Sequence, residues 1–405
     1  MDSAEREGLR PKGNVPNLRF PEFQGEWCNS RLGNVATIVG GGTPDTNVQE
    51  YWNGNIQWFT PSEIGIEKYA TNSIRTISNE GLKKSSAKLL PIGTILLSSR
   101  ATIGECSIAT KECTTNQGFQ SLIVKENYSN EFLYYLVQTK RKDLIRKSCG
   151  STFLEISANE IRKIYVTMPI LEEQEKIAKL LSLLDERIAT QSKIIEDLKK
   201  LKSAISKLLF TRKDLLETTI RLADIATLKN GYAFQSSKYN ILGKWKIITI
   251  ANVSGERYIN EEDCNCIINL PNDIQDHQVL KEGDILISLT GNVGRVSLCK
   301  SGAYLLNQRV GLLQIEGNID KEFLYQVLSS RRFENSMVAC GQGAAQMNIG
   351  KEDVENFVLP YSSNANNIHL VARILHSYDE CIINEQQDLT LLTMQKQYLL
   401  DQMFI

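Results

Sequence analysis

The strongest constraint on the fold is an internal repeat, because sequence motifs of the first half recur in the second half. Residues 31–41 (RLGNVATIVGG) align with residues 221–231 (RLADIATLKNG) at an offset of 190. Residues 93–107 align with residues 283–297 at the same offset, and the tetrapeptide EFLY occurs once in each half. Order and spacing are both kept, so the sequence predicts two copies of one structural unit.

Each half ends in a long helical pattern with a heptad repeat, and the two patterns are offset by 194 residues. Their polar interruptions coincide, Gln191 with Glu385 and Lys202 with Lys396. An apolar stripe this narrow suits a helix whose main partner is another helix, so we expect the two segments to pair as an antiparallel coiled coil that acts as a spacer. The alternative is a helix packed on the core of its own domain. The expected seam residues are Ile177, Leu181, Leu184, Ile188, Ile195, Leu198, Ile205, Leu209, Val371, Leu375, Tyr378, Ile382, Leu389, Leu392, Leu399 and Met403.

Between the helical patterns lie short predicted strands and loops rich in Gly, Asn, Ser and Thr, with helical stretches near 131–147 and 321–338. This mixture predicts an α+β fold, in which two repeated mixed α/β domains are separated by the two long helices. The expected segments are a mobile N-terminal tail at 1–17, a first domain at 18–168, a central spacer helix at 169–211, a second domain at 212–361 and a distal spacer helix at 362–405.

Charge limits the kind of partner that the chain can hold. Lys plus Arg is 46 and Asp plus Glu is 47, so the net charge of −1 favours neither an acidic partner nor a membrane surface. Residues 31–165 carry 16 basic and 12 acidic side chains, whereas residues 212–361 carry 16 and 18. A self-sufficient DNA-binding protein normally presents a plainly basic face, so we do not expect this chain to hold DNA alone.

Motifs for catalysis are missing from the sequence. It contains neither a GxxxxGK[ST] phosphate loop nor a GxSxG elbow, and it has no GxGxxG segment after a strand. With only three histidines, a metal cluster or a histidine general base has little support. The nine cysteines form no CxxC pair and indicate free thiols in a reducing compartment, so cytoplasm is expected. The sequence therefore predicts a protein that binds and does not catalyse.

Two loops carry polar side chains at matched places in the repeat. Residues 98–102 (SSRAT) and 288–292 (SLTGN) each follow a predicted strand and precede a fixed glycine. The amides at 116–117 and 307–308, together with Arg309, are able to bond adenine or guanine edges in a DNA groove. The alternative is that the Asn and Gln side chains cap turns and satisfy the backbone.

Several segments of the sequence resemble a known protein family. The segment from Pro169 to Phe210 (PILEEQEKIAKLL and onward) is similar to the central spacer of the specificity (S) subunit of type I restriction-modification systems. The lead at 18–36, with LRFPEFQGEW and LGNVA, resembles the N-terminal lead of that family. GTILLSSRATIG at 93–104 and GDILISLTGNVG at 283–294 resemble landmarks of its two target-recognition domains. The resemblance covers nearly the whole chain.

The resemblance implies a role in host defence. Each recognition domain would read one half of a bipartite, asymmetric site on double-stranded DNA, and the paired helices would fix the unread gap. The partners implied are two modification subunits, which methylate adenine with S-adenosylmethionine, and two restriction subunits, which translocate and cleave with ATP and Mg. This chain itself would bind no cofactor and no metal, would have no catalytic residue and would not touch a membrane.

The resemblance also implies which residues face partners. Trp58 has the alternative of being a core aromatic, and the expected partner-binding residues Glu172, Glu173, Lys179 and Arg187 have the alternative of a solvated face. The expected DNA-facing residues are Gly41, Gly42, Thr43, Pro44, Trp58, Thr60, Ser99, Arg100, Ala101, Thr102, Asn116, Gln117, Gly118, Gly231, Tyr232, Phe234, Asn252, Thr290, Gly291, Asn292, Gln308, Arg309, Gly341, Gln342 and Gly343.

Two other hypotheses compete with this one. A non-catalytic scaffold could carry two ligand-binding domains, for a carbohydrate or a peptide, on a coiled-coil rod, and it would act without any methyltransferase. A catalytic nuclease or methylase would need an acidic metal site or an NPPY-type or DPPY-type tetrapeptide, and the sequence contains neither NPP nor DPP.

Overall fold

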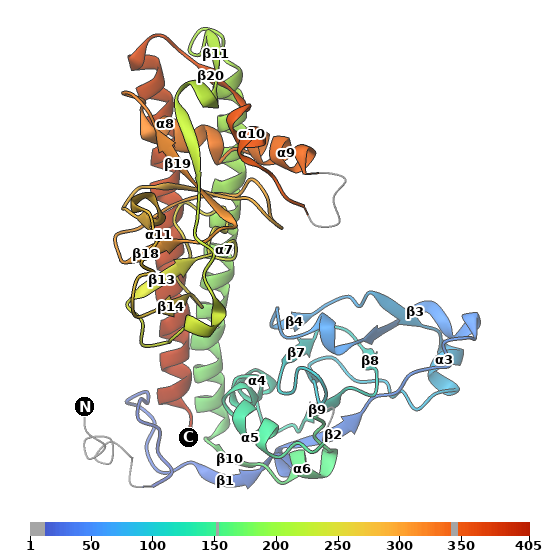
Figure 1. Ribbon diagram of the computed structural model, residues 1–405. Coiled ribbons are helices and arrows are strands. Elements are labelled where there is room, and N and C mark those ends of the chain that lie inside the picture. The colour runs from blue at the N-terminus through green and yellow to red at the C-terminus, as the bar shows by residue number, and fades with distance from the viewer. Residues whose placement is uncertain (1–12, 151–153, 342–346) are drawn as a thin grey trace. The chain divides into compact units, whose positions relative to one another are not determined.

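The structure is a computed structural model that describes residues 13–150, 154–341 and 347–405. The chain divides into two compact units, one formed by Met1–Thr190 with Leu389–Ile405 and the other by Gln191–Asp388. Each unit contains one mixed α/β domain together with part of each of two long helices (Figure 1). The predicted fold class, two mixed domains and two long paired helices, is confirmed.

The first unit is built on a five-stranded sheet of order β2-β9-β6-β7-β4 and a three-stranded sheet of order β5-β3-β8. A separate antiparallel pair, β1 with β10, joins the start of the domain to its end. The strands are β1 (Cys28–Arg31), β2 (Ala36–Gly40), β3 (Trp52–Phe59), β4 (Tyr69–Ala70), β5 (Arg75–Ile77), β6 (Ile95–Leu97), β7 (Cys106–Ala109), β8 (Cys113–Thr115), β9 (Gln120–Val124) and β10 (Tyr165–Met168). The helices are α2 (Leu32–Val35), η1 (Gln49–Tyr51), η2 (Pro61–Glu63), α3 (Asn79–Lys83), α4 (Asn130–Thr139), α5 (Arg141–Arg146) and α6 (Ala158–Arg162).

The second unit repeats this plan with sheets of order β12-β19-β16-β17 and β14-β13-β18-β15 and with the pair β11 and β20. The strands are β11 (Thr218–Arg221), β12 (Ala226–Asn230), β13 (Trp245–Ile248), β14 (Asn265–Ile267), β15 (Val279–Leu280), β16 (Ile285–Ser288), β17 (Val296–Leu298), β18 (Tyr304–Leu306), β19 (Val310–Ile315) and β20 (Val358–Tyr361). The helices are η3 (Leu222–Asp224), η4 (Ser236–Lys238), η5 (Asp276–Gln278), α8 (Lys321–Leu328), α9 (Arg331–Cys340) and α10 (Lys351–Glu355).

The repeat reaches the level of strand register. Ile38 in β2 faces Leu122 in β9, and the equivalent Leu228 in β12 faces Leu313 in β19. In the other large sheet of each unit, β3 runs parallel to β8 and β13 runs parallel to β18. The helical stretch expected near 131–147 is two helices, because the backbone leaves the helical conformation at Lys140. At the equivalent place in the second unit, Ser329 and the extended residue Ser330 separate α8 from α9.

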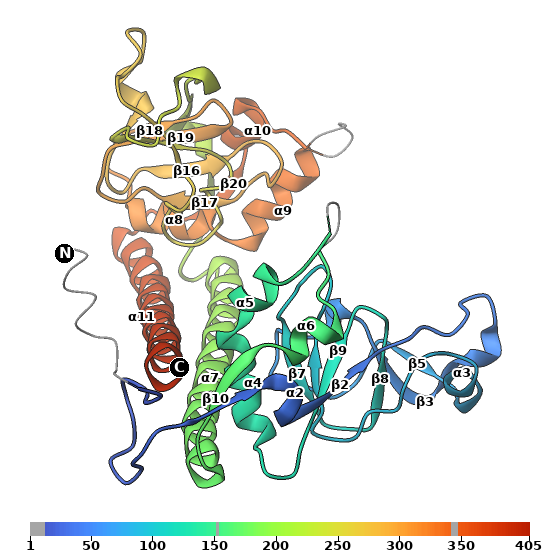
Figure 2. The same ribbon diagram turned by 90° about the horizontal axis from the view of Figure 1, so that it is seen from below.

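The long helices are α7 (Leu171–Thr211) and α11 (Ala365–Met403), and they run antiparallel side by side (Figures 1 and 2). In the first unit Lys396 Nζ lies 2.6 Å from Asp185 Oδ1, and in the second unit Lys202 Nζ lies 2.6 Å from Asp379 Oδ1. The Gln191 amide donates to the Glu385 backbone carbonyl at 3.1 Å. Every expected seam residue is buried or half-buried. The predicted antiparallel pairing is therefore confirmed.

Seam residues also pack in the hydrophobic core of the domain in their own unit. The sequence had left this open as the alternative to pairing between the helices. In the first unit Ile177 and Leu181 of α7 lie in one hydrophobic cluster with the fully buried side of α4. In the second unit Val371 and Leu375 of α11 lie in the equivalent cluster with α8. Each helix thus packs on its partner helix and on a domain, so the apolar surface of the seam is shared between two kinds of contact.

Aromatic side chains fix the same contact in both units. Phe132 of α4 stacks on Phe404 with ring centroids 5.0 Å apart, and Phe323 of α8 meets Phe210 edge to face at 6.4 Å. The helices α4 and α8 begin in equivalent ways, because the Ser129 hydroxyl and an Asp320 carboxylate oxygen accept the third N–H of their helix.

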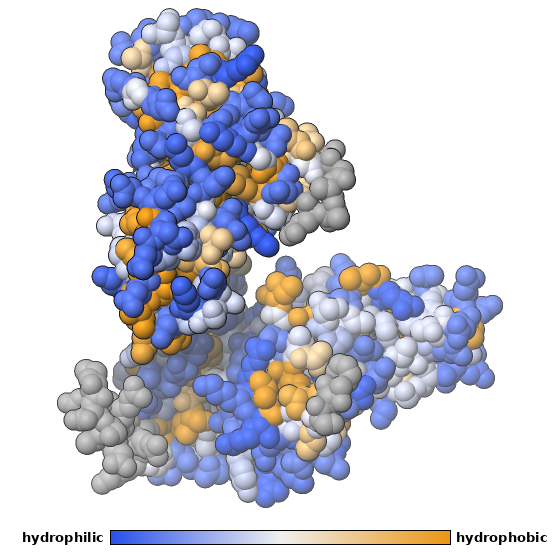
Figure 3. All heavy atoms as spheres, viewed as in Figure 1, coloured by the Kyte–Doolittle hydropathy of each residue, from blue (hydrophilic) through white to orange (hydrophobic). Residues whose placement is uncertain are grey.

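Of the expected N-terminal tail, residues 1–12 lie outside the described residues. Within 13–17, the Asn14 carbonyl accepts a hydrogen bond from the Trp27 N–H at 2.7 Å, and Pro16 is buried. Among the described residues, no helix has the length and apolarity needed to cross a bilayer. Figure 3 shows a surface that is mostly hydrophilic, with scattered apolar patches.

Candidate nucleic-acid interface

The two predicted recognition loops form the same turn after equivalent strands. Ser98, the residue after β6, donates its N–H to the Glu105 carbonyl and accepts from the Gly104 N–H, and Ser288, the last residue of β16, does the same with Arg295 and Gly294. Both glycines have positive φ, +89° and +77°. This left-handed conformation is what glycine adopts without steric cost, so the fixed glycines seen in the sequence close the turns.

The tips of these turns differ between the domains, because all three residues are exposed in the first, whereas in the second Asn292 is exposed and Thr290 and Gly291 are half-buried. Arg100 pairs with Glu155 at 2.8 Å, and it is followed by the exposed residues Ala101 and Thr102. In the second domain the Thr290 hydroxyl bonds the Asn348 amide oxygen at 3.0 Å. The remaining residues of that tip are Gly291 and Asn292. Ala101 has φ of +57° where its equivalent, Gly291, has +76°. Both domains therefore use the same left-handed turn to present different side chains, and the conformation is strained only at Ala101, because Gly291 adopts it freely.

The residue inside each turn is structural. Ser99 is fully buried, its N–H donates to Gly118 and its carbonyl accepts from Ile156. Leu289 takes this place in the second domain, with bonds to Arg309 and Ile349. The Ser99 side chain therefore does not lie on the exposed face, because it is enclosed between the turn and the following segment.

The matched asparagines cap turns, which is the alternative that the sequence left open. Asn116 Oδ1 accepts from the Gly118 N–H at 2.8 Å, and Asn307 Oδ1 accepts from the Arg309 N–H at 3.2 Å. These bonds to the residue two positions on hold the loop shape. They leave exposed the side chains of Gln117, which bonds the Thr43 hydroxyl, and of Gln308 and Arg309.

The glycines that precede these loops permit close backbone approach. A Cβ atom on Gly41 would lie 2.0 Å from the Asn116 carbonyl oxygen, and one on Gly231 would lie 2.2 Å from the Asn307 carbonyl oxygen. A Cβ on Gly42 would lie 2.3 Å from the Ala87 nitrogen. These positions shape the interface because no side chain fits there.

Several expected DNA-facing side chains are in the interior. Trp58 is 4% exposed, and its indole N–H donates to the Gly42 carbonyl at 2.9 Å, so it is the core aromatic that the alternative described. Asn252 is also 4% exposed, and its amide bonds the Thr249 N–H and the Asn260 carbonyl. Thr60 is half-buried and donates its hydroxyl to the Glu63 carboxylate at 2.6 Å.

Pro44, Gly118 and Gly341 are buried as well. Gln342 and Gly343, the rest of the expected glycine-rich turn, lie outside the described residues. The exposed face is therefore smaller than the sequence indicated, and it centres on the turn tips and on the loops after Asn116 and Asn307.

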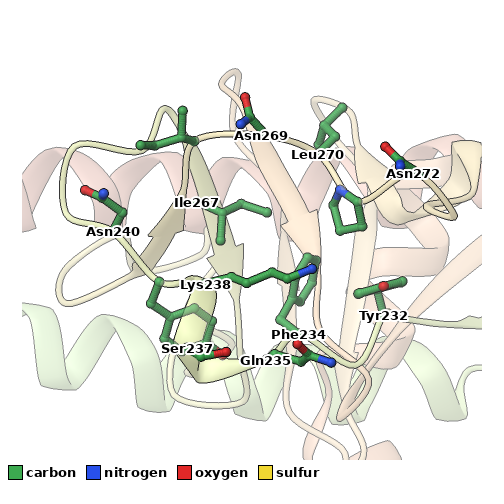
Figure 4. A pocket seen from close by; sticks show the side chains of 13 residues that line it. Tyr232, Phe234, Gln235, Ser237, Lys238, Asn240, Ile267, Asn269, Leu270 and Asn272 are labelled. Atoms are coloured by element: carbon green, nitrogen blue, oxygen red, sulfur yellow. The ribbon is translucent and has the colours of Figure 1, made fainter.

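A pocket of about 410 Å³ lies beside Tyr232 and Phe234 in the second domain (Figure 4). The two rings are 4.9 Å apart, and the Tyr232 hydroxyl donates to Asp273 at 2.8 Å, which raises the pKa of that phenol. The rim adds polar residues that the sequence reasoning missed, namely Lys238, Asn240, Asn269 and Asn272. The signal that could have found two of them is that Asn269 and Asn272 flank Pro271, a composition typical of a loop.

One expected partner-binding residue requires correction. Glu172, Lys179 and Arg187 are exposed on α7, but Glu173 is 1% exposed and does not face outward. Both of its carboxylate oxygens accept hydrogen bonds from Arg19, at 2.8 and 2.7 Å. Glu173 therefore fixes the N-terminal lead on the helix, since a buried carboxylate needs such a partner.

Comparison with known proteins decides the family. A family model described as "Type I restriction modification DNA specificity domain" matches residues 24–200 and 217–394. The chain belongs to this family.

Members of the type I specificity family match this chain over one half or over most of its length. The MjaIX specificity subunit of Methanocaldococcus jannaschii is 38% identical over 180 residues, 44% of this chain and 42% of the relative. The EcoR124I/EcoR124II specificity subunit of Escherichia coli is 29% identical over 42% of this chain and 43% of its own length. The match thus spans about two fifths of these two relatives. The MjaVIII specificity subunit of M. jannaschii is 26% identical over 85% of this chain and 83% of its own.

Two solved structures from type I restriction-modification systems share the fold of this chain. The S subunit of a type I restriction-modification system from M. genitalium superposes with a TM-score of 0.57 at 17% identity, covering 96% of this chain and 99% of that one. A chain from a structure that concerns complex assembly and conformational transition of the type I R-M system gives a TM-score of 0.59 at 17% identity. The match covers 95% of this chain and 98% of that one.

Proposed function

We propose that the chain is the sequence-reading subunit of a type I restriction-modification complex, with each domain reading one half of a bipartite, asymmetric DNA site. The observation that supports this most is the pair of equivalent turns. They share backbone bonds and glycines, yet they present Arg100 and Thr102 in one domain and Thr290 and Asn292 in the other. One scaffold with two different sets of side chains at the turn tip suits two half-sites of different sequence.

The long helices have the dimensions of a ruler for the unread gap. A helix of 41 residues such as α7 is about 60 Å long at 1.5 Å per residue. The chain carries no catalytic role in this proposal. Two modification subunits and two restriction subunits supply methylation and cleavage, and they dock on exposed polar positions such as Glu172, Lys179 and Arg187. The complex acts in the cytoplasm.

The test is a map of adenine methylation at single-molecule resolution across genomic DNA. Cells that carry the chain with its modification subunit are compared with cells that lack only the chain. We expect a bipartite motif with a fixed gap, present only when the chain is present. Identical maps, from cells in which the chain and its modification subunit are shown to be produced and associated, would contradict the proposal and favour a scaffold with another ligand.

A loop exchange makes the test specific to the turn. Replacing Thr290, Gly291 and Asn292 by the Arg, Ala and Thr of the first domain keeps a backbone that both sequences already adopt. The expected result is a change in one half-site only, with the other half-site and the gap unchanged.

A further inference from the structure

Two clusters of charged and polar side chains lie at matched places, each between a domain and the helix pair of its own unit. The first charge cluster consists of Lys68, Glu131, Tyr135, Ser182, Asp185 and Lys396. The second charge cluster consists of Arg257, Glu322, Gln326, Asp379, His376 and Lys202. The proposed DNA interface uses none of these residues.

In the second charge cluster, Asp379 of α11 joins three elements. One carboxylate oxygen lies 2.6 Å from Nζ of Lys202 on α7. The other accepts from Arg257 at 3.0 Å and from the Gln326 amide of α8 at 2.6 Å. Arg257 also makes a two-bond contact with Glu322, at 2.8 and 2.7 Å. The Asp379 carboxylate therefore contacts both α7 and the second domain.

In the first charge cluster, Asp185 of α7 has the same place. One oxygen lies 2.6 Å from Nζ of Lys396 on α11, and the other accepts from the Tyr135 hydroxyl of α4 at 2.6 Å. Lys68 donates to that hydroxyl at 3.2 Å and to Ser182 of α7 at 3.0 Å, and it pairs with Glu131. Burial and the hydrogen bond to Asp185 raise the pKa of Tyr135, so the phenol stays protonated as a donor.

The two clusters are equivalent by position. Adding 194 to Asp185 gives Asp379, and adding 194 to Lys202 gives Lys396. Lys68 and Arg257 also occupy equivalent positions. The backbone carbonyl of Lys68 accepts from the Ile108 N–H and that of Arg257 accepts from the Leu298 N–H, both at 2.7 Å, and Ile108 and Leu298 lie in equivalent strands. Different side chains, Lys with Tyr and Arg with Gln, thus make one arrangement.

These contacts restrict the helix pair because several of the charged side chains are buried. The side chains of Lys68, Arg257 and Asp379 are 8%, 7% and 8% exposed. A buried ion pair contributes little net stability against an apolar replacement, but an unpaired buried charge is strongly unfavourable. A polar residue in a coiled-coil seam is known to select one register for that reason. A slip of either helix here would separate Lys202 or Lys396 from its carboxylate.

We infer that Asp185 and Asp379 are positioning residues, each of which locks the register of the helix pair to the placement of the recognition domain beside it. The lysine contact fixes the helices, and the contacts with the domain fix the domain on them. The consequence for the unread gap rests on the proposed function, whereas the locking itself is a property of the chain.

The locking is tested on the full chain by distance measurement. Two spin labels are placed on exposed residues of the second unit, Ser203 on α7 and Asn318 before α8, through a non-cysteine chemistry because the chain has nine cysteines. Asp379→Asn should broaden the distance distribution. The control is Lys199→Met, which breaks an exposed pair between α7 and Glu256 of the same domain and should leave the distribution unchanged. Equal distributions for all three chains would overturn the inference.

A second variant separates positioning from folding. Lys202→Met with Asp379→Leu replaces the buried pair by apolar side chains and should recover most of the thermal stability lost in Asp379→Asn. In the methylation map it should still raise several-fold the modification of sites with a wrong gap, while both half-sites stay the same. A single unchanged gap with this variant would refute the locking role. If the parent chain yields no motif, the proposed function fails and the distance measurement still decides the inference.

Discussion

Arg309 is an exposed cation on the loop after Asn307 in the second domain, and it has no ion-pair partner among the described residues. Arg100, the cation of the first loop, is held by Glu155. An unpaired guanidinium beside a capped turn is free to make a two-bond contact with a guanine edge, whereas Arg100 would first have to leave its carboxylate. The two domains are therefore expected to depend on their arginines to different degrees.

Substitution of Arg309 tests this difference. Arg309→Ala should cost about 1 to 3 kcal/mol on the cognate site and relax the half-site read by the second domain only. Binding to cognate and altered sites, measured with the modification subunits present, gives the answer. Arg331→Ala, an exposed arginine on α9, is the control. An equal loss on every DNA would show that Arg309 contacts phosphate instead.

Glu322 makes stability depend on pH. Burial alone would raise its pKa, but hydrogen bonds from Arg257 and Gln326 outweigh this and lower the pKa from its ordinary value of 4.5. Asp379 and His376 also face the cluster. Because the pKa is lower in the folded state, the contribution is complete above the unfolded pKa and is lost as pH falls through the folded value.

Glu322→Gln should therefore lower stability by about 2 kcal/mol near neutral pH, with a smaller difference from the parent below about pH 4. Denaturant unfolding at a series of pH values measures the difference. Glu256→Gln removes a carboxylate from an exposed pair and should have little effect. A difference for Glu322→Gln that is constant from pH 7 to pH 3 would contradict this account.

At the scale of elements, the sequence was most informative where spacing alone decides structure. The heptads predicted both long helices and their pairing, and the repeat predicted equivalent strands such as β6 and β16. The burial of Glu173 depends on Arg19, 154 positions away, and no local pattern signals such a contact. The carboxylates Asp185 and Asp379 were missed for a similar reason, because each lies one residue after a seam position, where exposure is the usual expectation.

Changing the length of the helices tests the ruler. Seven residues inserted at matched places in α7 and α11 add about 10 Å, or roughly three base-pair steps. The methylated motif should gain that spacing and keep both half-sites. The insertion belongs in the stretch between the two charge clusters, so that Lys202 keeps Asp379 and Lys396 keeps Asp185. A new half-site with the old gap would rule out the ruler.

At the scale of the whole molecule, the low charge limits affinity. With 46 basic and 47 acidic side chains, the chain has little capacity to neutralise phosphates by itself. The exposed residues among those expected to face DNA are mostly neutral, such as Thr102, Gln117, Asn292 and Gln308. Composition indicated a low capacity to neutralise phosphates, but it could not indicate which of these side chains reach the surface, because that depends on the packing of the turns.

Salt dependence should show how the charge is shared. The slope of log affinity against log salt reports the number of phosphates neutralised. The chain alone should give a shallow slope, and addition of modification subunits should steepen it. Fluorescence anisotropy between about 50 and 200 mM salt measures both, with DNA that lacks the site as the control. A steep slope for the chain alone would mean that its own basic residues carry the binding.

The stacking of Phe132 on Phe404 bears on how the protein is made. The first domain contains Leu400, Met403 and Phe404 in its core, and Lys140 donates to the Ile405 backbone oxygen at 2.6 Å. The second unit draws only on Gln191–Asp388. During synthesis on the ribosome, the domain that emerges first therefore waits for residues 389–405, whereas the second unit is complete once residue 388 has been translated. The nascent first domain would meanwhile expose the apolar face of α4 to chaperones.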